Sequence, residues 1–182
     1  GSTHRPERCR LYEKAEAGTP VDQRVFAEGS WLRPQFIQFY RCRNVLVEDV
    51  HIVNSPMWEI HPVLSTNVTV RRVKIRSHGP NNDGCDPESC RDVLIEDCIF
   101  ETGDDCIAIK SGRNKDGRRV GVHSATIAIR PCTLKDVHGA VTMGNDVSGG
   151  VRNGSHSDSP LASTTLTLAF RCKRHHSLVQ RE

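Results

Sequence analysis

A short strand-like unit occurs four times in the middle of this chain, beginning at Val45, Val68, Val93 and Ile127. Each copy reads apolar, any residue, apolar, two polar residues, apolar, any residue, apolar. Alternation with a period of two predicts two short strands with a bend between them. An Asn or Asp, residues that favour turns, directly precedes each of the first three copies. A period of roughly 20 to 35 residues, built from strands and turns without helical periodicity, predicts a solenoid.

The fold class expected from this repeat is all-β, a right-handed parallel β-helix. The repeat is clear over residues 31–153, whereas residues 1–30 and 154–182 are irregular or divergent. A chain of 182 residues is long enough for one domain with a real core, so we expect a single β-helix domain over residues 1–182. It is expected to be a fragment, truncated at both ends. Between the third and fourth copies, residues 111–124 are predicted to project as a loop over one rim.

Composition excludes several classes of protein. The net charge is only +3, without a long run of one sign, and aromatic residues make up 5% of the chain, so a nucleic-acid partner is not expected. No stretch approaches the ~20 apolar residues that cross a bilayer, and the chain begins without a signal peptide, so no membrane association is expected.

The eight cysteines lack the paired C-x-x-C spacing of zinc sites, so neither a metal nor another cofactor is expected. Cys98 and Cys132 fall on inward positions of the repeat, where cysteine behaves as a small hydrophobic core residue.

A third short strand is expected after each copy, preceded by Pro56, Asp83, Asp105 or Gly139 at equivalent positions. Neighbouring parallel strands lie ~4.8 Å apart, so Asp83 and Asp105 should occupy successive rungs on one outer surface. Asp104 and His138 should lie beside them. An isolated Asn-Asp-Gly is usually only a turn. Three carboxylates in register next to a His-Gly instead favour acid and base chemistry on a sugar.

These residues resemble a known enzyme family. The chain is similar to the polygalacturonases of glycoside hydrolase family 28, most closely to their bacterial exo-acting branch, over roughly residues 31–153. Three of the four signature motifs of that family are matched, in the same order: Asn82-Asp83-Gly84, Gly103-Asp104-Asp105-Cys106 and His138-Gly139.

The resemblance implies hydrolysis of α-1,4-linked galacturonate with inversion, by one displacement with water. Asp104 would be the general acid, Asp83 and Asp105 would hold and deprotonate the water, and His138 would orient or tune the acid. An inverting pair needs carboxyl groups ~6.5 to 9.5 Å apart to leave room for water, a separation that aspartates on adjacent rungs can supply. Crowded carboxylates also raise at least one proton affinity, which keeps an acid available.

The fourth family motif is Arg-x-Lys, which binds the substrate carboxylate because cations distinguish a uronate from a neutral sugar. Arg171-Cys172-Lys173 has this form, although the chain from residue 154 onward departs from the family pattern, so Arg171 and Lys173 are either subsite residues or part of a solvated basic tail. Lys110 and Arg113 follow the Asp pair and are expected to bind substrate carboxylates, with ordinary surface charge as the alternative.

The expected partners are therefore polygalacturonate and pectin oligosaccharides, met outside the cytoplasm by a secreted or periplasmic parent protein. Two alternatives stay open. One is a hydrolase of a related pectin backbone such as rhamnogalacturonan. The other is a truncated, non-catalytic β-helix module that binds carbohydrate.

Overall fold

The computed structural model describes residues 4–135, 138–143 and 146–156, and it is built mainly from short parallel strands. The strands are β1 (Ile37–Tyr40), β2 (Arg43–Glu48), β3 (His51–Val53), β4 (Ile60–Val63), β5 (Thr66–Arg71), β6 (Lys74–Ser77), β7 (Arg91–Glu96), β8 (Ile99–Thr102), β9 (Ile107–Ile109), β10 (Ser124–Ile129), β11 (Thr133–Lys135), β12 (Val141–Met143) and β13 (Val151–His156). Two α-helices, α1 (His4–Glu16) and α2 (Asn114–Val120), and a 3-10 turn at Val21–Gln23 complete the described elements.

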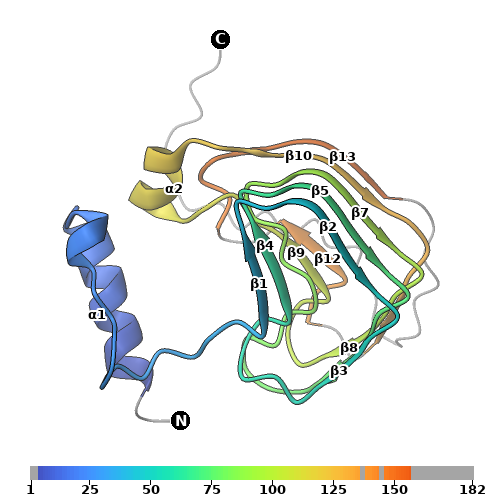
Figure 1. Cartoon of the computed structure of the whole chain (residues 1–182), viewed down its shortest axis with the longest axis horizontal. Helices are drawn as coiled ribbons and strands as arrows, with labels where there is room; N and C mark the ends of the chain where they lie inside the picture. The colour runs from blue at the N-terminus through green and yellow to red at the C-terminus, as the bar shows by residue number, and fades with distance from the viewer. Residues whose placement is uncertain (1–3, 136–137, 144–145, 157–182) are drawn as a thin grey trace.

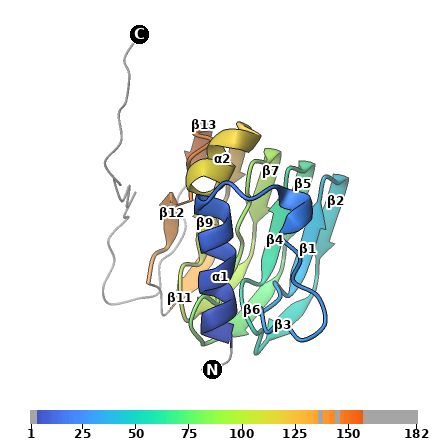
Figure 2. The ribbon, with the colours of Figure 1, turned by 90° about the vertical axis from the view of Figure 1, so that its left-hand side faces the viewer.

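The strands form three parallel faces of one coil (Figure 1). One face is the sheet β13-β10-β7-β5-β2 and the second is the sheet β11-β8-β6-β3. The third face contains the pairs β1-β4 and β9-β12, which are joined by bridges from Ile60 through Cys85 to Ile107. Strands of one face come from successive turns of the chain and lie side by side, as Figure 2 shows for β2, β5 and β7. The parallel β-helix predicted from the repeat is confirmed.

The core lies inside the coil because strands pair in register, which stacks equivalent side chains of successive turns. Val45, Val68, Val93 and Ile127 form one such inward column, and all four are buried. Burial of each such side chain contributes about 1.5–3 kcal/mol relative to exposure. Outward neighbours such as Leu46 remain exposed. The period-two pattern of the sequence therefore gives the inward and outward faces correctly.

Turn residues of the repeat adopt left-handed backbone conformations at stacked positions. Asn44, Asn67 and Asp92 lie at one level of the coil and have φ of 57°, 56° and 58°. Asn and Asp tolerate this region better than other residues with a Cβ. The Asn67 side-chain amide also donates a hydrogen bond of 2.8 Å to the Asn44 side chain below it. These residues therefore bend the chain at the second position of β2, β5 and β7, at the start of the first face.

The helices are the main departure from the sequence prediction. Helix α1 lies within the segment expected to be irregular, and it packs outside the coil on the side of the third face (Figures 1 and 2). The segment expected to be a rim loop contains α2, which ends at Gly121 in the left-handed region, a common way for helices to stop. Within the described residues, no helix is long and apolar enough to cross a membrane.

Candidate active site

Asp83 and Asp105 lie on successive rungs at the start of the third face. The Gly84 N–H donates to the Asp105 carbonyl at 3.0 Å, and the Cys106 N–H donates to the Gly139 carbonyl at 2.8 Å. Asp83, Asp105 and Gly139 therefore occupy equivalent positions, as predicted, and neighbouring rungs are ~4.8 Å apart.

The equivalent residue of the preceding rung is Trp58, because the Glu59 N–H donates to the Asp83 carbonyl. The prediction that Pro56 held this place was wrong by two residues. The turns between the second and third faces differ in length from rung to rung, so counting along the sequence does not give the register there.

Asp104 precedes this column, and two backbone groups hold its carboxylate. Its Oδ2 accepts a hydrogen bond of 3.2 Å from the Asn81 N–H, and its Oδ1 accepts one of 3.1 Å from the Asp105 N–H. The Thr102 hydroxyl also donates to the Asp104 carbonyl at 3.0 Å. Since Asn81 lies in the neighbouring rung's turn, Asp104 is held beside both Asp83 and Asp105.

Burial and mutual repulsion raise the pKa values of Asp83 and Asp105. Asp83 is only 4% exposed, and burial raises its pKa to about 6; Lys110 opposes this rise, while Asp104 and Asp105 add to it. Burial also raises the pKa of Asp105, against the hydrogen bond of 2.9 Å from the Thr142 hydroxyl. The cluster therefore retains a proton at mildly acidic pH.

Each of these two aspartates has one buried carboxylate oxygen that makes no hydrogen bond to the described residues. Within the described part of the chain, Oδ1 of Asp83 and Oδ1 of Asp105 are buried and have no hydrogen-bond partner. Their other oxygens are held by Lys110 and Thr142, respectively. Two fixed carboxyls, each with an oxygen that lacks a hydrogen bond, are suited by their chemistry to accept a proton from a small donor such as water.

Asn82 fixes the turn that carries Asp83. The Asn82 side chain is buried, and its amide nitrogen lies 2.7 Å from Ser77 Oγ, 2.8 Å from the Ser55 carbonyl and 3.3 Å from Glu59 Oε1. Glu59 itself is fully buried, and burial raises its pKa. The motif residue Asn82 thus connects the turn to the rung before it.

The predicted His138-Gly139 pair borders Asp105. A Cβ on Gly139 would lie 2.5 Å from Asp105 Oδ1 and 2.3 Å from Thr142 Cγ2, so only glycine leaves room for this aspartate. His138 is exposed, and its N–H lies 3.5 Å from the Asp104 carbonyl. The structure therefore brings Asp83, Asp104, Asp105 and His138 together, as the sequence predicted.

Lys110 is buried beside the aspartates, whereas the sequence suggested a surface position in the cleft. Its Nζ lies 3.3 Å from Asp83 Oδ2, 3.7 Å from Asp86 Oδ2 and 4.3 Å from the centre of the Trp58 ring. These contacts engage the ammonium with protein groups, although the predicted contact with substrate stays a prediction.

Arg113 lies away from this cluster, at the start of α2. Its guanidinium stacks over the Tyr12 ring of α1 at 4.5 Å, and its Nε lies 3.7 Å from Asp146 Oδ1. Arg171 and Lys173 lie outside the described residues, so their predicted role stays a prediction as well.

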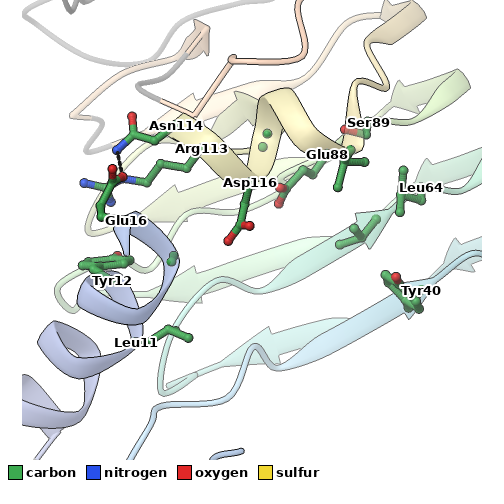
Figure 3. Close-up of a pocket in the computed structure, with 15 residues that line it drawn as sticks. Leu11, Tyr12, Glu16, Tyr40, Leu64, Glu88, Ser89, Arg113, Asn114 and Asp116 are labelled. Atoms are coloured by element: carbon green, nitrogen blue, oxygen red, sulfur yellow. Dashed lines mark hydrogen bonds between the residues drawn. The ribbon is translucent and has the colours of Figure 1, made fainter. Parts of the chain in front are cut away.

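A cavity of about 480 Å³ separates α1 and α2 from the third face (Figure 3). Several polar side chains that line it are already paired: Asn114 with Glu16 at 2.8 Å, Glu88 with His61 at 2.8 Å, and Asp116 with Arg24. The aspartate cluster is not part of its lining. We therefore place the candidate active site at the aspartates.

Two residues of the site, Thr142 and Asp86, were not predicted from the sequence. Each lies on the third face, one residue after a paired position: Thr142 follows Val141 in β12, and Asp86 follows the bridged Cys85. The available signal was a polar residue that alternates with the apolar core positions next to the aspartate column, although both side chains are buried. Among the described residues, no group of His, Cys, Asp or Glu is arranged to hold a metal ion.

Comparison with known proteins identifies relatives of this chain. The family model "Glycosyl hydrolases family 28" matches residues 27–168. The crystal structure of a hyperthermoactive exopolygalacturonase from Thermotoga maritima aligns with 86% of the chain and 36% of its own length, with a TM-score of 0.83 and 56% identity. A family 28 exopolygalacturonase from Yersinia enterocolitica aligns with 85% of the chain and 28% of its own length, with a TM-score of 0.54 and 16% identity, and so supports the fold alone.

Among curated proteins, a probable polygalacturonase from Vitis vinifera is 34% identical over 126 residues, which is 68% of this chain and 26% of that protein. The chain thus spans about a quarter to a third of the length of these relatives. The family match covers most of the chain and includes every residue of the aspartate cluster. The chain belongs to glycosyl hydrolase family 28.

Proposed function

We propose that the protein hydrolyses α-1,4-galacturonosyl linkages of polygalacturonate with inversion and acts from a chain end. The observation that carries this proposal is the stacking of Asp83 on Asp105, with the Asp104 carboxylate bound by the backbone N–H groups of Asn81 and Asp105. Carboxyls on both sides of one glycosidic bond are what inverting hydrolysis requires. The exo-acting mode is supported by the likeness to the Thermotoga maritima exopolygalacturonase.

In this proposal Asp104 is the general acid. Its proton passes to the glycosidic oxygen as the bond from that oxygen to the anomeric carbon breaks. The backbone donors of Asn81 and Asp105 hold the side chain in a fixed orientation, which favours one direction of proton delivery. His138 lies next to the same turn and assists by hydrogen bonding.

Asp83 and Asp105 hold the water and accept its proton while its oxygen attacks the anomeric carbon. Their unpaired Oδ1 atoms are the acceptors for this step. A base works only as the carboxylate, and the pKa of Asp83 is raised by burial to about 6. Activity of the free enzyme should therefore fall as the pH drops through that range.

Pectin oligosaccharides are the proposed partners, and the proposed place of action is outside the cytoplasm. Arg171, Lys173 and Arg113 remain proposed as cations for the substrate carboxylates, since a guanidinium or ammonium discriminates a uronate from a neutral sugar.

The test is product analysis on polygalacturonate with the protein at its natural length. Monogalacturonate released as the β-anomer is the expected product, and Asp104→Asn should lower turnover by about 10²–10⁴-fold, the usual contribution of a general acid. Asp92→Asn, an equally conservative change at an exposed position of β7 on the first face, is the control and should leave turnover unchanged.

Other outcomes would identify the alternatives. Release from rhamnogalacturonan but not from polygalacturonate would assign a related pectin-backbone hydrolase. Binding of pectin oligosaccharides without release from either polymer would assign a non-catalytic β-helix module. Unchanged turnover in Asp104→Asn would refute the acid assignment.

A further inference from the structure

A buried lysine is enclosed by groups of the candidate site. Lys110 directly follows β9 and bridges to Glu88 of the neighbouring rung. Only 5% of Lys110 is exposed, so its ammonium has little access to solvent or to a ligand. Asp83 and Asp86 lie on one side of the ammonium, and the Trp58 ring lies within the distance of a cation–π contact.

Asp86 is the second carboxyl at this lysine and is not used by the proposed reaction. It is fully buried, and within the described residues neither of its oxygens has a hydrogen-bond partner. An unpaired buried charge is costly, so Asp86 depends on the ammonium 3.7 Å away or on a proton. One cation therefore faces two buried carboxyls, and only Asp83, at 3.3 Å, has a direct hydrogen bond from it.

We propose that Lys110 is a positioning residue for Asp83, anchored by Asp86 and Trp58, which fixes the Asp83 side chain and keeps it in the carboxylate form. The inference rests on the proposed function, because it assigns the residue that prepares the base of that reaction. It differs from the role in substrate binding expected from the sequence. With only 5% of Lys110 exposed, a substrate carboxylate has little access to this ammonium.

The charges around this group define the expected effect on pH dependence. The pKa of Asp83 is influenced by the charges of Lys110, Asp104 and Asp105. The pKa of Lys110 is influenced by Asp86, Asp83 and Asp146. The pKa of Asp86 is influenced by Lys110, Asp83, Asp105 and Glu88. Burial by itself would lower the pKa of Lys110, but the three aspartates around it raise it, so the ammonium stays protonated. Burial raises the pKa of Asp86 well above its usual range.

Without the lysine charge, only burial and the repulsion from Asp104 and Asp105 act on Asp83. Both effects raise its pKa, which should then lie above about 6. An opposite charge at this distance typically lowers a carboxyl pKa by about 1–3 units. The acidic limb of the rate profile should therefore move to higher pH by a similar amount when Lys110 is replaced.

The first experiment compares Lys110→Met with the unaltered protein at its natural length. The acidic limb of kcat/KM on polygalacturonate should shift upward by about 1–3 pH units, with KM at the pH optimum nearly unchanged. Lys74→Met is the matched control, because Lys74 is exposed on β6, on another face of the coil. A raised KM with an unmoved acidic limb would assign Lys110 to substrate binding and overturn the inference.

The second experiment needs no turnover and leaves Lys110 in place. In the unaltered protein, NMR titration should show the Asp83 carboxyl and the Lys110 Cε signals changing with one common midpoint, with Asp83 assigned by its loss in Asp83→Asn. A Lys110 signal that stays constant while Asp83 titrates would contradict the inference. This result is independent of catalysis, so absence of hydrolysis would refute the proposed function alone.

Discussion

Replacing Gly84 of the Asn-Asp-Gly motif by alanine tests how tightly the rungs of this coil are stacked. A Cβ built on Gly84 would lie 2.6 Å from the Cys106 carbonyl oxygen and 2.6 Å from Phe100 Cδ1. Ordinary contacts of a Cβ begin at 3.4 Å, so these neighbours would have to retreat by about 0.8 Å. One of them is backbone and the other is a fully buried ring.

The expected cost of Gly84→Ala follows from two opposing effects. Overpacking of a dense core costs about 1–3 kcal/mol. Restriction of the unfolded chain by the new methyl group offsets about 0.4–1 kcal/mol of that loss. The free energy of unfolding should therefore fall by about 1–2 kcal/mol, measured by equilibrium urea denaturation with circular dichroism.

A double-mutant cycle identifies the cause. Phe100→Leu removes part of the ring that the new methyl group would meet, so the double variant should be more stable than the sum of the single effects by at least about 0.5 kcal/mol. Simple additivity would show that the ring is not the obstacle. An unchanged free energy of unfolding in Gly84→Ala would refute the stacking argument itself.

Two further predictions concern the site and the core. Thr142→Val removes the hydroxyl that donates to Asp105, so the pKa of that carboxyl should rise further. As a result, kcat/KM should fall on the acidic side of its pH profile while the alkaline side stays unchanged. An acidic limb that does not move would contradict this role. Ile95→Ala in β7, where the side chain is fully buried, should lower the free energy of unfolding by about 2–5 kcal/mol. Leu46→Ala, on the exposed side of β2, should change it by less than about 0.5 kcal/mol in the same denaturation assay.

The sequence was sufficient to predict the parts of the fold in which spacing is regular. Strand pairs of constant length stack in register, so the apolar alternation identified the inward columns and placed Asp83 one rung from Asp105. Where the turn length changes between rungs the prediction failed, and Trp58 takes the place expected for Pro56. Register there depends on how each turn folds back, which local pattern does not encode.

The burial of side chains at the site also could not be predicted from the sequence. Lys110 follows the Asp pair and looked like a surface cation, yet the Trp58 ring and two carboxyls from neighbouring rungs enclose it. Those contacts join residues that are 24 or more positions apart in the chain. Helix α1 was also missed, because its sequence lacks an apolar stripe and the helix is held to α2 largely by polar contacts such as Asn114 to Glu16.

The central claim is that the stacked aspartates face one glycosidic bond together. The most direct test is a crystal structure of the Asp104→Asn protein, at its natural length, with a galacturonate oligomer bound. We expect the scissile oxygen within hydrogen-bond distance of residue 104 and a water held by Asp83 and Asp105 on the opposite side of the sugar. An oligomer bound on another face of the coil, with no contact to these residues, would contradict the account.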